Sequence, residues 1–281
     1  LSKNCEATLL ELATHTSGIS DDGHYDKAYL FNQPLEKEKF APAWEKFIAI
    51  YNQNKPMKME HYLQQIFAPN GRWNTSDNFT EYAPGTNYDY SNLAVGLLAR
   101  CIELAVDKDF KTYSQETLLT PLGMNRSHWD WSQSDTLNHI IYYNEDKHPV
   151  PPYHTITYPD GGWFTSTADL TLFLQAMMKG YFGASKLLAD TSFQIMMSNQ
   201  IPELDAPTGI IWDMDNTCCI GHGGNDFGIA TMMFFSPKTG LGKILFTNIS
   251  IEKEELEDTF YAIFGKMFKY DDEMVLLMSE D

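Results

Sequence analysis

The segment Tyr88-Asp89-Tyr90-Ser91-Asn92-Leu93 leads directly into residues 93–106, where apolar residues recur at helical spacing. The turn signal Pro84-Gly85 comes just before it. The Tyr-Ser-Asn triplet is therefore predicted at the entrance of a buried helix. A tyrosine can act as a general base when nearby cations lower its pKa from about 10, and the amide of Asn92 can orient a substrate carbonyl. Taken alone, such a triplet more often has a purely structural role, because tyrosine is common in protein cores.

On either side of this helix the sequence predicts two kinds of structure. Residues 20–85 are polar and aromatic with short helical stretches, and form an irregular helical lobe with further helices predicted over 168–179 and 190–198. Three apolar stretches near the end of the chain alternate with turn residues and predict an antiparallel meander, followed by an amphipathic helix. The strands are expected at 209–213, 228–235 and 242–248, and the helix at 254–270.

This pattern predicts an α/β protein of the α+β type, with an antiparallel sheet flanked by helices and a helical lobe. The 281 residues are expected to form a single domain. Residues 1–200 form mainly the helical lobe, and residues 205–281 form the sheet strands and the C-terminal helix.

Two further segments carry candidate site residues. Gly221-His222-Gly223-Gly224-Asn225 crowds glycines around a histidine just before or within a strand, where a backbone N–H can serve as an oxyanion donor. A tight turn with a surface histidine is the alternative. Gly161-Gly162-Trp163 precedes a capped helix and forms either a pocket wall or only a loop.

Composition excludes several classes of function. The formal net charge of -18 argues against binding nucleic acid, which needs clustered Lys and Arg. No apolar stretch is long enough to span a membrane, and the first residues do not form a signal peptide. The eight histidines have no metal-ligand spacing, so neither a metal nor another cofactor is expected. The adjacent Cys218 and Cys219 are not expected to bridge each other easily.

Several segments together resemble the serine β-lactamase-like family, which includes penicillin-binding proteins, class C β-lactamases, D-alanyl-D-alanine carboxypeptidases and esterases. The resemblance covers nearly the whole chain, in the order of the family. It rests on Leu10–Ile19 ("LLTHTSG"), Ala83–Leu98 ("PGT..YSN.gy.LL"), Pro121–Met124 ("PLGM"), Gly161–Leu170 ("GG..STa.DL"), His222-Gly223-Gly224 (H-x-G or K-T-G) and Phe234–Asn248.

The resemblance implies acyl transfer to a serine from an S-x-x-K motif, followed by hydrolysis of the acyl-enzyme formed from a peptide, ester or β-lactam. Tyr90 would exchange protons with that serine, and Asn92 would orient the substrate. His222 would line the cleft beside Gly224, and the Asn225 backbone N–H would supply half of the oxyanion hole. Trp163 would wall the pocket.

The chain departs from the family pattern at the nucleophile. The family's S-x-x-K lies upstream of "HTSG", so the first helix, the first strands and the nucleophile helix are expected to be missing from residues 1–281. We expect the chain alone to be inactive and to need that N-terminal segment. Ser250-Ile251-Glu252-Lys253 and Lys238-Thr239-Gly240 imitate family motifs and are interpreted as chance matches.

Two functional hypotheses remain open at this point. The first is a serine hydrolase with a small-molecule or peptide acyl substrate, and the second is a non-catalytic binding or scaffold domain of the same fold. An S-x-x-K upstream of this chain would favour the enzyme. The resemblance also implies a bacterial envelope location, periplasmic or secreted.

Overall fold

The structure is a computed structural model that describes residues 6–130, 139–215 and 218–278. Its residues group into two compact units built from interleaved segments. The first unit contains residues up to 139, 151–166 and 201–206, and the second contains 140–150, 167–200 and 207 onward. The two parts of the predicted helical lobe at 140–150 and 167–200 thus belong with the sheet. The chain combines helices with an antiparallel sheet, as the sequence predicts.

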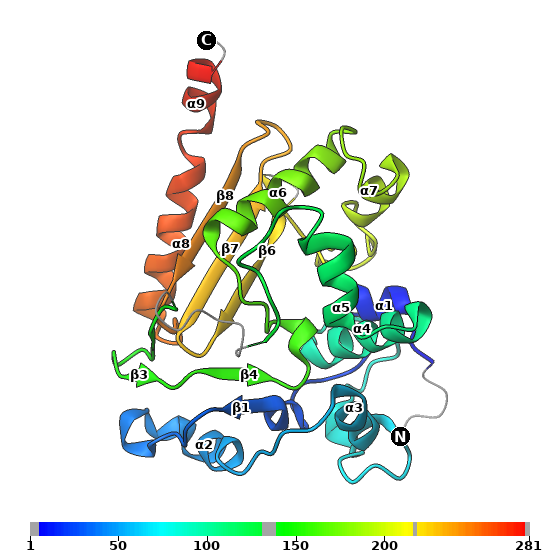
Figure 1. Cartoon of the computed structure of the whole chain (residues 1–281), viewed down its shortest axis with the longest axis vertical. Helices are drawn as coiled ribbons and strands as arrows, with labels where there is room; N and C mark the ends of the chain where they lie inside the picture. The colour runs from blue at the N-terminus through cyan, green and yellow to red at the C-terminus, as the bar shows by residue number, and fades with distance from the viewer. Residues whose placement is uncertain (1–5, 131–138, 216–217, 279–281) are drawn as a thin grey trace. The chain divides into compact units, whose positions relative to one another are not determined.

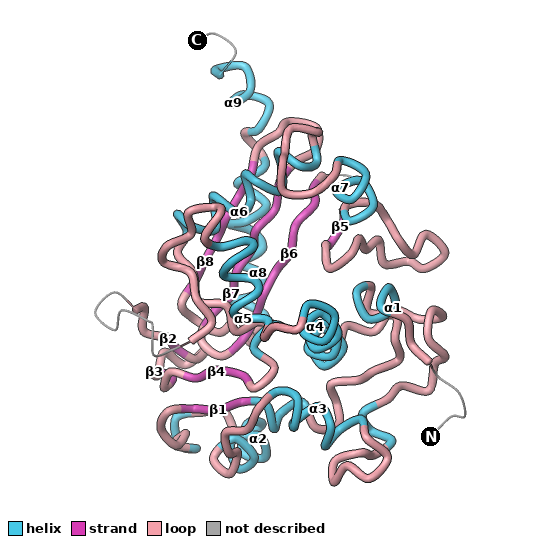
Figure 2. Tube along the Cα trace, turned by 45° about the vertical axis from the view of Figure 1, so that its right-hand side comes forward, coloured by secondary structure: helices cyan, strands magenta, loops and turns pink. Residues whose placement is uncertain are grey.

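The first unit is built around helix α4 (Asn92–Val106), with α1 (Leu9–Ala13) and α3 (Met59–Phe67) beside it (Figure 2). Leu93, Ala94 and Ala99 of α4 are buried against Leu12 of α1 and against Tyr62, Leu63 and Ile66 of α3. The helical spacing of apolar residues after Leu93 therefore reports a buried helix face, as predicted. The unit also contains β1 (Tyr29–Phe31), α2 (Glu45–Tyr51), α5 (Phe110–Ser114) and β4 (Tyr153–Thr155).

The second unit contains a four-stranded antiparallel sheet in the order β5-β6-β7-β8. The strands are β5 (Asp213–Asp215), β6 (Cys219–Asp226), β7 (Ile229–Phe235) and β8 (Gly242–Thr247). Helices α6 (Thr167–Tyr181) and α8 (Glu254–Phe268) accompany the sheet (Figure 1). Helices α7 (Asp190–Met196) and α9 (Asp271–Met278) and the short strands β2 (Tyr142–Tyr143) and β3 (Pro149–Val150) complete the unit.

Alternation along β7 explains how α6 and α8 cover opposite faces of the sheet. Ala230 and Met232 pack in one cluster with Ile251 and with Phe260 of α8. The side chain of Phe235 lies on the opposite face of β7 from Ala230 and Met232. Its ring centroid is 5.3 Å from that of Tyr181 of α6. A strand with apolar residues on both faces is typical of a sheet that is covered on both sides.

The predicted strand at 209–213 is wrong in its position. The first strand of the sheet is β5, which begins at Asp213, and Ile211 has a positive φ of 57° that interrupts an extended chain. The backbone of this stretch is held instead by a turn, because Gly209 N–H donates to the carbonyl of Trp212. β6 also goes beyond the sequence prediction, because it continues through the glycine-rich segment.

Candidate active site

The Tyr-Ser-Asn triplet lies at the entrance of a buried helix, as the sequence predicts. Ser91 is the N-cap of α4, and its Oγ accepts a hydrogen bond from Ala94 N–H at 3.1 Å. The backbone of Ser91 is extended, whereas Asn92 is the first helical residue. Ser91 is buried, so its hydroxyl has a capping role, while Tyr90 just before it is 42% exposed.

Asp21 fixes this helix entrance from a loop that is distant in the sequence. Its carboxylate accepts hydrogen bonds from Ser91 Oγ at 3.0 Å, Leu93 N–H at 3.0 Å, and both the backbone N–H (2.7 Å) and Nδ2 (2.9 Å) of Asn92. Burial raises the pKa of Asp21, and the hydrogen bonds from Leu93, Asn92 and Ser91 act in the opposite direction. A carboxylate beside a helix N-terminus also interacts favourably with the helix dipole.

These bonds determine what Asn92 can offer to a substrate. One hydrogen of Nδ2 is engaged with Asp21, which fixes the orientation of the amide plane. The other hydrogen and the oxygen Oδ1 have no hydrogen-bond partner among the described residues. Asn92 is therefore a preoriented donor and acceptor at the helix entrance, and its substrate-orienting role stays a prediction.

His15 fixes the tyrosine in the same way. The ring of His15 is stacked on that of Tyr90 with 4.2 Å between centroids, and its Nδ1 accepts the backbone N–H of Ser91 at 3.2 Å. The carbonyl of His15 accepts the N–H of Asp89 at 2.8 Å. His15 is only 2% exposed and has a φ of 54°, an unusual conformation for a residue other than glycine that persists because the surrounding bonds hold it.

Asp21 and the contact role of His15 were missed by the sequence analysis. The segment containing His15 was recognised only as a family motif, and Asp21 was not singled out at all. The two residues reach Tyr90 and Asn92 across about seventy residues of chain, and a single sequence gives no signal of such a pairing.

The second candidate segment lies within β6 rather than in a tight turn. His222 pairs with Met233, Gly224 with Thr231 and Asn225 with Ala230. Because paired residues lie on the same face, His222 and Gly224 face the side of α6, and the Asn225 side chain faces the side of α8. Asn225 Nδ2 accordingly donates to Glu252 Oε1 at 3.3 Å. Only the backbone N–H of Asn225 is thus suited to the predicted oxyanion role.

Strand pairing on the outer edge of β6 ends before the candidate residues. β5 pairs with residues 219–221 only, so the positions from His222 to Asp226 have β7 as their single strand partner within the described chain. The ring of His222 is held by Nδ1, which donates to the carbonyl of Gly223 at 2.6 Å. In a neutral ring this bond leaves Nε2 unprotonated. An open strand edge of this kind offers backbone groups to an extended ligand.

Glycines keep this strand flat and close to β7. A Cβ at Gly221 would overlap the carbonyl oxygen of Met233, and one at Gly224 would lie 2.9 Å from Thr231 Oγ1. The glycines of β6 are therefore explained by its close packing against β7, where a side chain at these positions would not fit.

Trp163 belongs to an aromatic cluster of the first unit. Its ring is stacked on that of Trp129 with 6.0 Å between centroids, and Trp129 contacts Tyr158 edge-on at 5.5 Å. Trp129 Nε1 donates to Ser114 Oγ at 2.9 Å, which fixes the cluster to the end of α5. The role of Trp163 as a pocket wall remains a prediction.

The predicted site residues are thus divided between the units. Tyr90, Asn92 and Trp163 lie in the first unit, where the structure brings Tyr90 and Asn92 together at one helix entrance. His222, Gly224 and Asn225 lie together on β6 of the second unit.

The S-x-x-K imitation at Ser250 has a structural explanation. Ser250 is only 3% exposed, and its Oγ accepts the N–H of Gly228 at 2.8 Å. Lys253 forms a surface ion pair with Asp146 at 2.5 Å. A buried serine that accepts a backbone hydrogen bond, with the lysine of the motif paired elsewhere, is not arranged as an activated nucleophile.

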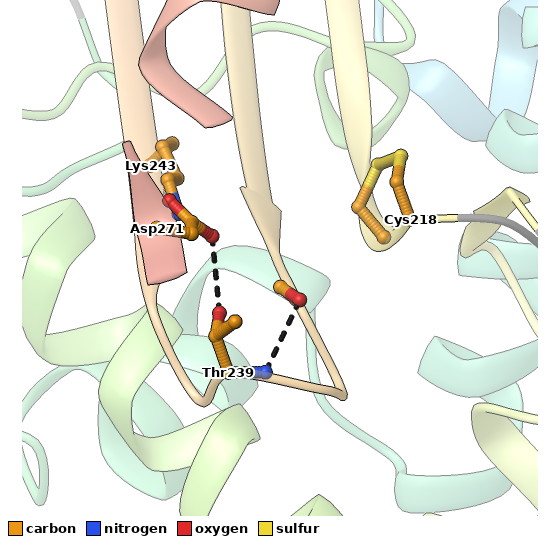
Figure 3. Close-up of a disulfide and its surroundings, with 6 residues drawn as sticks. Cys218, Thr239, Lys243 and Asp271 are labelled. Carbon is orange, nitrogen blue, oxygen red and sulfur yellow. Dashed lines mark hydrogen bonds and ion pairs between the residues drawn. A yellow bond between two sulfur atoms is a disulfide. The ribbon is translucent and has the colours of Figure 1, made fainter. Parts of the chain in front are cut away.

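The Lys238-Thr239-Gly240 triplet likewise lies in the turn between β7 and β8 (Figure 3). Thr239 N–H donates to Ser236 Oγ at 3.3 Å, and Thr239 Oγ1 donates to Asp271 at 3.0 Å. Asp271 also forms a buried ion pair with Lys243. This triplet connects the hairpin to the start of α9 and is a structural feature, as interpreted from the sequence.

Cys218 and Cys219 form a vicinal disulfide at the start of β6, so the expectation that they would not easily bridge is wrong (Figure 3). Their sulfur atoms and a carboxylate oxygen of Asp215 lie within 4.8 Å of one another. Among the described residues, these three side chains are the one group that could supply three metal ligands. The two sulfur atoms would be the stronger ligands, but they are bonded to each other.

None of the helices among the described residues has the length and hydropathy needed to cross a bilayer.

The chain belongs to the β-lactamase family, because the sequence model of that family matches residues 2–266. Its fold is similar to that of a penicillin-binding protein from Bacillus halodurans (19% identity, TM-score 0.62), with coverage of 94% of this chain and 74% of the other. A D-alanine carboxypeptidase from Burkholderia cenocepacia has 19% identity and a TM-score of 0.59, with 92% and 71% covered. A search of curated proteins found no match.

A third similar structure is an octameric penicillin-binding protein homologue from Pyrococcus abyssi, with 19% identity and a TM-score of 0.62. The match covers 86% of this chain but only 52% of the other, so the chain spans about half of the length of that relative. At these identities the structural similarity shows the fold, and the activity must be argued from the site.

Proposed function

We propose that the protein is a serine hydrolase that forms and hydrolyses an acyl-enzyme from a peptide, ester or β-lactam substrate. The observation that carries the proposal is the entrance of α4, where half-buried Asp21 and buried His15 hold Asn92 and the ring of an accessible Tyr90 in fixed positions. Buried polar groups arranged around an exposed functional group are typical of a preorganised catalytic site.

Each predicted residue has a step in this reaction. The serine oxygen bonds to the carbonyl carbon of the substrate while Tyr90 takes the proton of the serine hydroxyl. Tyr90 then gives this proton to the leaving group as the bond between that group and the carbonyl carbon breaks. The Asn225 N–H stabilises the carbonyl oxygen as it becomes negative, and Asn92 orients the substrate. The oxygen of a water then bonds to the acyl carbon while Tyr90 takes its proton, the ester bond to the serine breaks, and Tyr90 returns the proton to the serine oxygen. We place the serine in an S-x-x-K motif outside residues 1–281, since Ser250 is buried and bonded to Gly228.

The edge of β6 supports an extended substrate such as a peptide. The segment beyond Gly221 has no β5 partner, so a substrate strand could pair with backbone groups there, such as the N–H of Asn225. Similar folds are found in a carboxypeptidase from Burkholderia cenocepacia and a D-amino acid amidase from Ochrobactrum anthropi, which act on amide bonds. A location in the bacterial envelope would suit such a substrate and is part of the proposal.

The test is intact mass spectrometry after incubation with a fluorophosphonate or penicillin probe. We expect a covalent adduct on the full-length protein and none on residues 1–281 alone. The adduct should map to a serine followed three residues later by a lysine. Failure of both proteins to react would support the alternative of a binding or scaffold domain, and an adduct on Ser250 would contradict the assignment of the nucleophile.

A further inference from the structure

A small cavity lies on the first unit between the end of α2 and the segment that follows α3. Its volume is about 290 Å³, near the lower end of the range for ligand pockets. Trp73 is its rigid wall, because the indole packs edge-on against fully buried Tyr62 at 5.7 Å. The apolar lining also includes Ala49, Ile50 and Met57.

The charged residues that line this cavity are all basic. They are Lys27, Lys55 and Arg72, and no carboxylate lines it. The chain has 20 basic and 38 acidic residues, so three charged residues drawn at random would all be basic in only about 4 of 100 draws. A positively charged cavity on a protein of net charge -18 is therefore a local reversal of sign.

These cations are not neutralised by ion pairs. In the part of the chain that the structure describes, none of them lies within 4.0 Å of a carboxylate oxygen. Arg72 Cζ lies 4.2 Å from the centroid of the Trp73 ring, and Lys27 Nζ lies 5.6 Å from it. Stacking on the indole holds the guanidinium of Arg72 at the cavity. The N–H donors along the edge of the guanidinium can then bind an anion.

The carboxylate of Asp26 interacts electrostatically with Lys27, one of the three basic residues of the cavity. Its carboxylate accepts the hydroxyl hydrogen of Tyr51 at 3.0 Å, which orients it away from a simple ion pair. Burial raises the pKa of Asp26, while Lys46 and Lys27 act in the opposite direction. Asp26 therefore compensates Lys27 in part, and Lys55 and Arg72 remain the main positive charges.

We propose that this cavity binds a small organic anion, in which an oxyanion group is attached to a compact apolar group. The guanidinium of Arg72 and the ammonium of Lys55 bind the oxyanion, and Met57, Ile50 and the accessible edge of Trp73 contact the apolar part. The site is built entirely from the first unit and does not depend on the proposed hydrolase function. The size of the cavity limits the ligand to about that of a substituted aromatic acid or phosphate monoester.

The experiment measures binding of phenyl phosphate to the full chain by titration calorimetry and by the indole resonance of Trp73, which is identified by its loss in Trp73→Phe. The test variant is Lys55→Gln/Arg72→Gln. The control is Lys37→Gln/Lys39→Gln, which removes the same charge from two lysines outside the cavity that form ion pairs with Glu45 and Glu36. Both variants change surface side chains, so both are expected to fold, which circular dichroism checks.

We expect phenyl phosphate to bind and to shift the Trp73 resonance, with an affinity that falls as salt is added. The test variant should lose roughly tenfold or more in affinity, and the control should change less than about twofold. Benzyl alcohol, which lacks the charge, should bind much more weakly. Equal losses in the two variants, equal binding of benzyl alcohol, or an unmoved Trp73 resonance would each overturn the proposal.

Discussion

The entrance of α4 and the edge of β6 carry the two groups of predicted site residues, and each group is fixed by different physical means. At the helix entrance, the side chains of half-buried Asp21 and buried His15 hold the predicted site residues from a segment that is distant in the sequence. On β6, the ladder with β7 holds the backbone, and the side chains are small, partly exposed or directed to the other face. The first region depends on side-chain identity and the second depends on backbone geometry.

This difference has a consequence for mutation. A substitution among the buried groups around α4 removes a hydrogen-bond acceptor that no water replaces, which is costly. A substitution of a β6 side chain leaves the ladder intact if the new residue fits the strand. The residues of the two regions should therefore differ in how much stability and activity change when their side chains are truncated.

The largest effect is expected from Tyr90→Phe in the full-length protein. Removal of the hydroxyl takes away the proposed proton-transfer group, while the ring can keep its stacking on His15. We expect the rate of hydrolysis to fall by roughly 10²-fold to 10⁴-fold with little change in Tm. The measurement is kcat/KM with a chromogenic lactam or short-chain ester, and retention of full activity would remove Tyr90 from the mechanism.

The next effect in size is expected from Asp21→Ala. The change leaves two backbone N–H groups of α4, the hydroxyl of Ser91 and the amide of Asn92 without their shared acceptor. We expect a loss of about 2–4 kcal/mol in the free energy of unfolding, measured by urea denaturation of the full-length protein. Asp22→Ala, which removes the same charge from the exposed neighbouring residue, should change stability by less than about 0.5 kcal/mol.

The sequence predicts the helices far better than it predicts the short strands. The helix predicted over 168–179 and the helix after Ser91 lie where the apolar spacing places them, because one face of each helix is buried. By contrast β1 and β4 are three residues long and exist only through pairing with each other across more than a hundred residues, for instance Leu30 with His154. The local sequence of a short strand does not indicate which distant strand pairs with it.

The same reasoning applies to the candidate site. The motifs containing Tyr90, Asn92 and His222 are local, so the sequence alone singles them out. The hydrogen bonds from Asp21 join positions about seventy residues apart, and the orientation of Asn225 follows from its register against Ala230. These features depend on tertiary contacts and become visible only in the structure.

Glu252 provides a smaller effect that is specific to the strand region and depends on pH. Burial raises the pKa of Glu252 above its ordinary value of 4.5, Glu145 and Glu257 raise it further, and the hydrogen bond from Asn225 lowers it. The folded protein thus binds this proton more tightly than the unfolded chain does. The contribution of Glu252 to stability therefore falls as the pH rises from about 4.5 through the raised pKa, and is constant above it.

Glu252→Gln should remove this part of the pH dependence while retaining an oxygen that can accept from Asn225 Nδ2. We expect the variant to gain stability relative to the wild-type protein as the pH rises through the raised pKa, with the two proteins converging at low pH. Urea denaturation between about pH 4 and 7 measures this difference. A variant that loses stability at neutral pH would show that the charge itself, and not only the hydrogen bond, holds the end of β6.

The smallest effect is expected from Asn225→Ala, and it tests the comparison most directly. The Asn225 side chain lies on the face of β6 opposite to His222 and donates to Glu252, whereas its backbone N–H is the proposed oxyanion donor. Alanine keeps that N–H and fits the strand, so kcat/KM of the full-length protein should change by less than about threefold. A loss near that of Tyr90→Phe would mean that the side chain acts on the substrate, and that both regions of the site depend on side-chain identity.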